Sequence, residues 1–226
     1  MDRNKNIVHV VWTTSNQLVG CSEIKNALKC LLMLVGGSPS TLTNLSVSTT
    51  TNNNNNSDSS VVDSTTFNNN NNLTVQSNNS RTGGELKRIE MNNIDEAITR
   101  IRIAELLLQY TFNHDEARYH LEKSVFLLDS DSTDHSMELL CKISSYLIDY
   151  FHTNNAFNLA KQWLKKAIKY SISLKNNQWL LYFLIKESHI LFRENQPKPV
   201  FNSIDQAIKL AINMKDTFCH VTMLGF

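Results

Sequence analysis

Proline and glycine are scarce in this chain, which has 3 prolines and 6 glycines among 226 residues. Since these residues interrupt helices and form tight turns, their scarcity predicts long elements with few breaks. The four cysteines, Cys21, Cys30, Cys141 and Cys219, are widely separated and form no CxxC pair, which favours reduced thiols over a disulfide framework or a zinc site. The net charge of +1 gives no electrostatic indication of binding to nucleic acid or to an anionic membrane.

Long apolar runs are also missing. The longest candidates, ALKCLLMLV at 27–35 and WLLYFLI at 179–185, fall far short of the roughly 20 apolar residues that a membrane-spanning helix needs. We therefore interpret them as buried faces of helices. The segment IVHVVW at 7–12 is too short for the core of a signal peptide, and no small-residue cleavage site follows it.

The motifs of common catalytic sites do not occur. The seven histidines form neither an HExxH motif nor a pair four residues apart, and the chain has no GxSxG or GxxxxGK[ST] sequence. We therefore predict no catalytic residue, no metal site and no cofactor.

The composition divides the chain into three zones. Residues 1–35 form a mildly apolar N-terminal segment, in which we expect one helix at about 23–35. Residues 36–84 contain two runs of five asparagines, at 52–56 and 68–72, amid serine and threonine. Such a segment cannot bury enough apolar surface to offset the entropy of ordering it, so we predict a disordered low-complexity insertion.

The third zone, 93–226, is dominated by apolar residues at helical spacing. No part of it alternates polar and apolar residues for long enough to suggest a strand. The breaks between periodic segments predict all-α helical hairpins at about 93–129, 136–175 and 178–213, with the start of a further helix at 216–226.

The second helices of these hairpins share one pattern, in which a small residue, a large aliphatic residue and another small residue follow at spacings of four and three. The matching positions are Ala117, Leu121 and Ser124, then Ala160, Leu164 and Ala167, then Val200, Ile204 and Ala207. The leading residues lie 43 and then 40 residues apart, as expected of helix–turn–helix repeats. The small residues allow close helix approach and the large one fills the groove, which is a degenerate tetratricopeptide pattern. In the first unit the same frame puts Glu105 where a small residue is usual. Three unrelated amphipathic hairpins are the alternative explanation.

A stack of such hairpins is a solenoid with a concave surface, formed by the first helix of each hairpin. The positions expected on that surface are Arg102, Gln109, Lys142, Ser145, Asp149, His152, Tyr182, His189 and Arg193. Their mixed polar character suits hydrogen bonding to a peptide, although an ordinary solvated surface would have the same composition. We interpret the short basic stripe of Lys161, Lys165 and Lys166 as a solvated face, because the charge of the whole chain is balanced.

Three stretches resemble the tetratricopeptide subunit of the cohesin loader, a chromatid cohesion factor of the Mau/Scc type. They are RIRIAELLLQYTFNHDEARYHLEKS at 100–124, NLAKQWLKKAIKYS at 158–171, and IKNALKCLLMLV at 24–35, which resembles the helix preceding the family's first clear repeat. Members of that family are much longer arrays, so the resemblance implies a fragment or a truncated member.

The resemblance implies a non-catalytic subunit that wraps the extended N-terminal segment of the large HEAT-repeat loader subunit, of the Nipped-B/adherin type. Through that subunit it would act on cohesin, in sister chromatid cohesion and cell division. It implies no sequence-specific contact with nucleic acid and no membrane association. The expected location is the nucleus, and an additional cytoplasmic pool is compatible with the resemblance. The alternative function is a tetratricopeptide scaffold for another protein complex, and an enzyme is a distant third.

Overall fold

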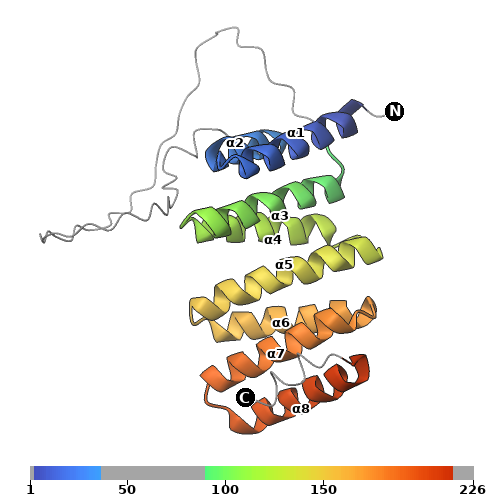
Figure 1. The fold of residues 1–226 in the computed structure, drawn as a ribbon. Coiled ribbons are helices and arrows are strands. Elements are labelled where there is room, and N and C mark those ends of the chain that lie inside the picture. Colours follow the sequence, from blue (N-terminus) through green and yellow to red (C-terminus); the bar gives the residue numbers. More distant parts are fainter. Residues whose placement is uncertain (1–2, 37–89, 216–226) are drawn as a thin grey trace, which may run out of the picture.

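The computed structural model describes residues 3–36 and 90–215, which form eight α-helices and no strand (Figure 1). The predicted insertion at 36–84, apart from Gly36, and the predicted helix at 216–226 lie outside the described residues. The helices are α1 (Arg3–Gly20), α2 (Ile24–Leu34), α3 (Asn93–Tyr110), α4 (His114–Leu128), α5 (Asp134–Thr153), α6 (Phe157–Ser173), α7 (Asn177–Arg193) and α8 (Pro197–Met214).

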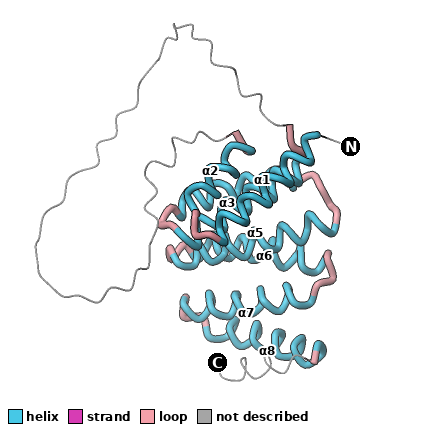
Figure 2. Tube along the Cα trace, turned by 45° about the horizontal axis from the view of Figure 1, so that its top comes forward, coloured by secondary structure: helices cyan, strands magenta, loops and turns pink. Residues whose placement is uncertain are grey.

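Consecutive helices pair as hairpins, and the hairpins stack along one direction (Figures 1 and 2). Each second helix also packs on the first helix of the next hairpin, as α4 does on α5 and α6 on α7. In addition, α3 contacts α5 and α5 contacts α7, whereas no comparable contact joins the described helices α4, α6 and α8 to one another. The first helices therefore lie closer together and form the concave side. The predicted all-α solenoid of helical hairpins is confirmed.

Local sequence signals set the ends of these helices. The first helices α3, α5 and α7 each begin with a side-chain cap, in which Asn92, Thr133 and Asn176 accept hydrogen bonds from backbone N–H groups of the first turn. The turns that follow α5 and α7 place Asn155 and Asn195 in the left-handed region, with φ of 56° and 57°. Asparagine tolerates this conformation better than most residues, so tight hairpins form without glycine.

The residues of the pattern that the second helices share lie at the contacts between helices. Eight of its nine residues are at most 6% exposed, and Ile204, in the last described unit, is half-buried. On α3 the small residue next to the assigned position, Ala104, is fully buried, whereas Glu105 is turned away from the hairpin interior. The frame assigned to the first helix of this unit is thus shifted by one position.

Residues 3–20 form helix α1, where the sequence suggested only the helix at about 23–35. Helix α1 buries little apolar surface, since Val8 is its only buried apolar side chain among the described residues, so its pattern is weak. On α2 the buried residues Ala27, Leu31 and Leu34 repeat the spacing of four and three seen in the later second helices. Helices α1 and α2 therefore form a hairpin of the same kind. Trp12 attaches it to α3 by donating a hydrogen bond from Nε1 to Thr99 Oγ1 over 3.0 Å.

Candidate functional site

The surface of α3, α5 and α7 that faces the concave side carries a continuous line of polar side chains, which we call the first-helix wall. It is held by interactions that cross from one repeat unit to the next. Its components are three groups of residues, which follow one another along the solenoid.

The first group joins α3 to α5 through Glu105. Lys142 Nζ lies 2.6 Å from Glu105 Oε1, and the Tyr146 hydroxyl donates to the same oxygen over 3.0 Å. Burial and the negative charge of Glu105 raise the pKa of Tyr146, so its hydroxyl stays protonated and continues to donate. One carboxylate thus fixes two side chains of the next unit.

The second group joins α5 to α7 in a related way, with Asp149 as the carboxylate. Lys186 Nζ lies 2.6 Å from Asp149 Oδ1, and the Tyr182 hydroxyl donates to Oδ2 over 3.4 Å. Burial alone would lower the pKa of Lys186, but the hydrogen bond and charge of Asp149 outweigh it and raise this pKa. The same arrangement of carboxylate, lysine and tyrosine therefore occurs at two successive unit boundaries.

The third group lies at the carboxyl-terminal ends of α5 and α7 and carries positive and neutral donors. Burial, with Arg193 and Lys186 nearby, lowers the pKa of His152. Burial, with Lys186 and His152 nearby, lowers the pKa of His189. Both imidazoles are therefore neutral at pH 7. The Arg193 guanidinium donates to Asn155 Oδ1 over 3.2 Å at the hairpin turn.

Three of the nine residues that were expected on the concave surface do not belong to the three groups described above. Arg102 is half-buried and donates to Asn16 Oδ1 of α1, so it joins the N-terminal hairpin to the wall. Gln109 is exposed near the end of α3. Ser145 is only 9% exposed, and its hydroxyl donates to the Lys142 carbonyl oxygen of its own helix over 2.7 Å. Because that donor is already used inside the helix, Ser145 does not fit a role in surface contact.

The sequence analysis did not identify three members of the wall, Glu105, Tyr146 and Lys186, nor Asn16 of α1, which holds Arg102. Helical spacing would have found two of them, since Tyr146 follows Lys142 by four residues and Lys186 follows Tyr182 by four. Glu105 was assigned to the hairpin interior by the shifted frame. Asn16 lies on the helix that was not expected.

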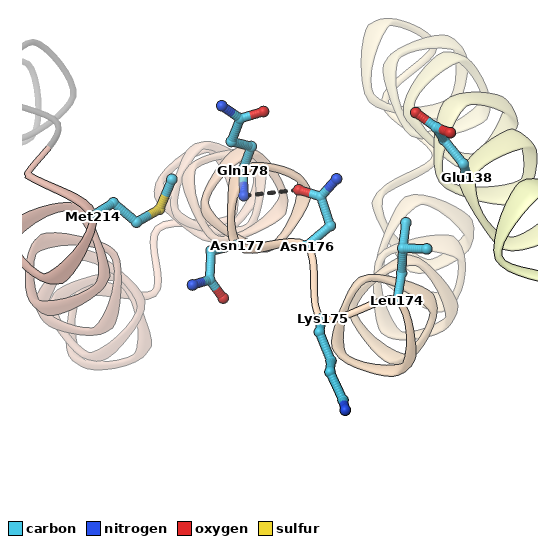
Figure 3. Close-up of a pocket in the computed structure, with 7 residues that line it drawn as sticks. All are labelled: Glu138, Leu174, Lys175, Asn176, Asn177, Gln178 and Met214. Carbon is cyan, nitrogen blue, oxygen red and sulfur yellow. Dashed lines mark hydrogen bonds between the residues drawn. The ribbon is translucent and has the colours of Figure 1, made fainter.

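An open hollow of about 500 Å³ lies at the turn between α6 and α7 (Figure 3). Its lining includes Glu138, Lys175 and Met214 (Figure 3). Two residues of this lining, Glu138 and Gln178, come one helical turn before Lys142 and Tyr182 of the wall. Asn176 uses its Oδ1 to accept from the N–H groups of Gln178 and Trp179 over 3.0 and 3.2 Å, so it acts as a helix cap. Residues 3–36 and 90–215 contain no group of three or more His, Cys, Asp or Glu side chains that could hold a metal ion.

None of the described helices is long and apolar enough to cross a membrane. A search of curated proteins gave no match, and a search of solved structures gave none either. A family model described as cohesin loading factor matches residues 86–224, which is more than half of the chain and includes all of the first-helix wall. That family consists of non-catalytic, scaffold-type helical subunits with a role in cohesin loading and sister chromatid cohesion, within a complex that acts on chromatin in the nucleus. The repeat architecture and this match together show that the chain belongs to the cohesin loading factor family.

Proposed function

We propose that the first-helix wall binds the extended N-terminal segment of the large HEAT-repeat subunit of the cohesin loader, the Nipped-B/adherin type. Binding of this segment would make the chain the scaffold through which the large subunit is held while cohesin associates with chromatin. The observation that carries the proposal is the line of interactions crossing from α3 to α5 and from α5 to α7.

These cross-unit interactions support binding because they prepare the surface in advance. Lys142 and Lys186 are held by carboxylates of the preceding unit, so ordering them costs a partner little entropy. Their side chains remain 43% and 29% exposed, and Asp149 remains 46% exposed, so they can still accept a second contact. A fixed polar surface on the concave side of a solenoid suits an extended peptide, whose backbone needs donors and acceptors at regular intervals.

The test is co-purification of the full chain with the large subunit from native cells. The wall variant combines Lys142→Ala with Asp149→Ala, which removes one group from each cross-unit interaction. The matched control combines Lys123→Ala with Asp205→Ala, which removes the same two residue types from the outer helices α4 and α8. We expect the wall variant to recover at least about tenfold less large subunit, because a buried charge contact at an interface contributes about 2 kcal/mol or more.

The control variant should recover the large subunit as the wild type does, and both variants should keep the wild-type circular dichroism spectrum. Equal recovery by the wall and control variants would contradict the proposed location of the site. Recovery of chaperones or a ubiquitin ligase by the wild type, without the large subunit and cohesin, would contradict the proposed partner and favour the alternative scaffold function.

A further inference from the structure

The outer face of α6 carries more positive charge than the outer faces of the other second helices. Helix α6 carries four lysines and no acidic residue, although the chain as a whole has a net charge of only +1. Helix α2 also lacks acidic residues, but it has only two lysines, Lys25 and Lys29. In contrast, α4 and α8 mix both signs along their length. The overall balance of charge therefore hides a local concentration of positive charge on the middle unit.

The repeat frame shows how this difference arises. Five residues after the leading small residue, α4 has Glu122 and α8 has Asp205, and each is paired with a base on its own helix, Arg118 over 3.5 Å and Lys209 over 2.6 Å. The same position in α6 is Lys165. The outer face is thus neutralised by an ion pair on α4 and on α8 and left positive on α6.

Three of the α6 lysines point away from the hairpin: Lys165, Lys166 and Lys169 are exposed, because the helix turns Leu164 and Ala167 inward. Among the described residues, none of these three forms an ion pair, and Lys166 lies over the ring of Trp163 at 4.5 Å. The fourth, Lys161, is paired with Glu194 over 2.8 Å and therefore adds no unpaired charge to this face.

We propose that the outer face of α6 contacts the phosphate backbone of duplex DNA without reading its sequence. The compact ammonium groups of lysine are suited to phosphate as point charges, and backbone contacts of this kind need no groove and no base-specific hydrogen bond. The family's role on chromatin makes duplex DNA an available partner for such a face.

The shape of the surface favours duplex DNA over an acidic peptide. The three lysines lie on a convex helix face and are not part of the hollow beside the α6–α7 turn. They are also not part of a second, smaller hollow of about 160 Å³ at the turn between α7 and α8, whose lining includes Phe192, Val200 and Phe201. A disordered acidic peptide would lose conformational entropy on binding and would find no groove to offset that loss, whereas the duplex is already rigid. This contact lies on the face opposite the first-helix wall and does not depend on the proposed partner.

The test measures binding of the full chain to a fluorescein-labelled 30-base-pair duplex by anisotropy, at 50 to 200 mM salt. The α6 variant combines Lys165→Gln, Lys166→Gln and Lys169→Gln. The control variant combines Lys123→Gln, Lys198→Gln and Lys209→Gln, which changes the net charge equally on α4 and α8. Since each phosphate contact contributes about 0.9 to the salt slope, three contacts correspond to a slope of about −2.7, or about a 40-fold loss of affinity across this salt range.

We expect the wild type and the control variant to show this salt dependence on duplexes of two unrelated sequences. The α6 variant should bind at least about tenfold more weakly at 50 mM salt and lose most of the slope, because each replaced lysine removes about one counterion release. Equal weakening of both variants, unchanged binding by the α6 variant, or absence of binding by the wild type would overturn the proposal. Tighter binding of a labelled poly-glutamate peptide than of the duplex would also overturn it and assign the face to an acidic protein. Circular dichroism of each variant establishes that its fold is intact.

Discussion

Replacement of Leu164 by alanine tests the repeat frame where packing is most complete. Leu164 is 1% exposed and lies on α6 between the fully buried Ala160 and Ala167, at the contact with α5. Removing its branched side chain loses the transfer free energy of the buried methyl groups and leaves a cavity that rigid neighbouring helices fill poorly. We expect a loss of about 3 kcal/mol in the free energy of unfolding, within the range of about 2–5 kcal/mol for buried Leu→Ala changes.

Two further substitutions, at less buried positions, serve as comparisons for Leu164→Ala. Ile204 holds the same position in the last described unit but is half-buried, so we expect Ile204→Ala to cost about 1 kcal/mol, roughly half the transfer term without a closed cavity. Leu159 lies on the same helix as Leu164 but is 43% exposed, so Leu159→Ala should cost no more than about 0.5 kcal/mol.

The assay is urea unfolding of each variant, followed by circular dichroism at 222 nm, with the midpoint and slope fitted separately. A loss for Leu164→Ala that is no larger than the loss for Ile204→Ala or Leu159→Ala would refute the assigned frame. A lower slope for Leu164→Ala alone would indicate that the middle unit couples its neighbours, as expected of a solenoid in which each unit contacts only adjacent ones.

Two other outcomes follow from single contacts. His120 is 4% exposed, and burial together with the nearby Arg100 lowers its pKa from 6.5 to about 4, so between these pH values the unfolded chain binds the proton and the folded chain does not. The free energy of unfolding should therefore fall by about 3 kcal/mol as the pH drops from 6.5 to 4, at 1.36 kcal/mol per pKa unit. In the His120→Gln variant, a plot of unfolding free energy against pH should lack this decrease. A variant with the wild-type pH profile would rule out this role of His120. Trp12→Phe should weaken the docking of the α1–α2 hairpin on α3 by about 1–3 kcal/mol, because Thr99 loses the donor of its hydrogen bond while the aromatic contact is largely kept. Faster amide exchange confined to α1 and α2 would verify this weakening.

Much of the fold could be predicted because the sequences of the second helices repeat the same types of packing residue at the same spacing. A small residue at Ala117 or Ala160 permits close approach, and its spacing to Leu121 or Leu164 is dictated by the helical period, so periodicity alone locates the contact. Helix α1 was not predicted because its few buried groups include the polar Ser15. It packs on α2 and is bonded to α3 through Trp12 and Asn16, and such contacts are not encoded in the local sequence.

The site was less predictable, because its members are defined by partners on other helices. Asp149 and Tyr182 could be placed on the concave side by spacing, but nothing in the sequence shows that Lys186 joins them over 2.6 Å. Glu105 shows the converse problem: a shift of one position turns an interior residue into the carboxylate that holds Lys142 and Tyr146. Side-chain pairing across units depends on the superhelical offset between hairpins, which only the packed structure specifies.

Site-specific photocrosslinking would identify the face of the solenoid that contacts the large subunit. A photoreactive amino acid placed at Gln109, on the exposed end of the wall, is compared with one at Tyr119, which is 51% exposed on α4, in the full chain co-expressed with the large HEAT-repeat loader subunit. We expect Gln109 to crosslink to the N-terminal segment of the large subunit and Tyr119 not to do so. Crosslinks to that segment from Tyr119 alone, or from neither position in a complex that nevertheless co-purifies, would contradict binding at the first-helix wall.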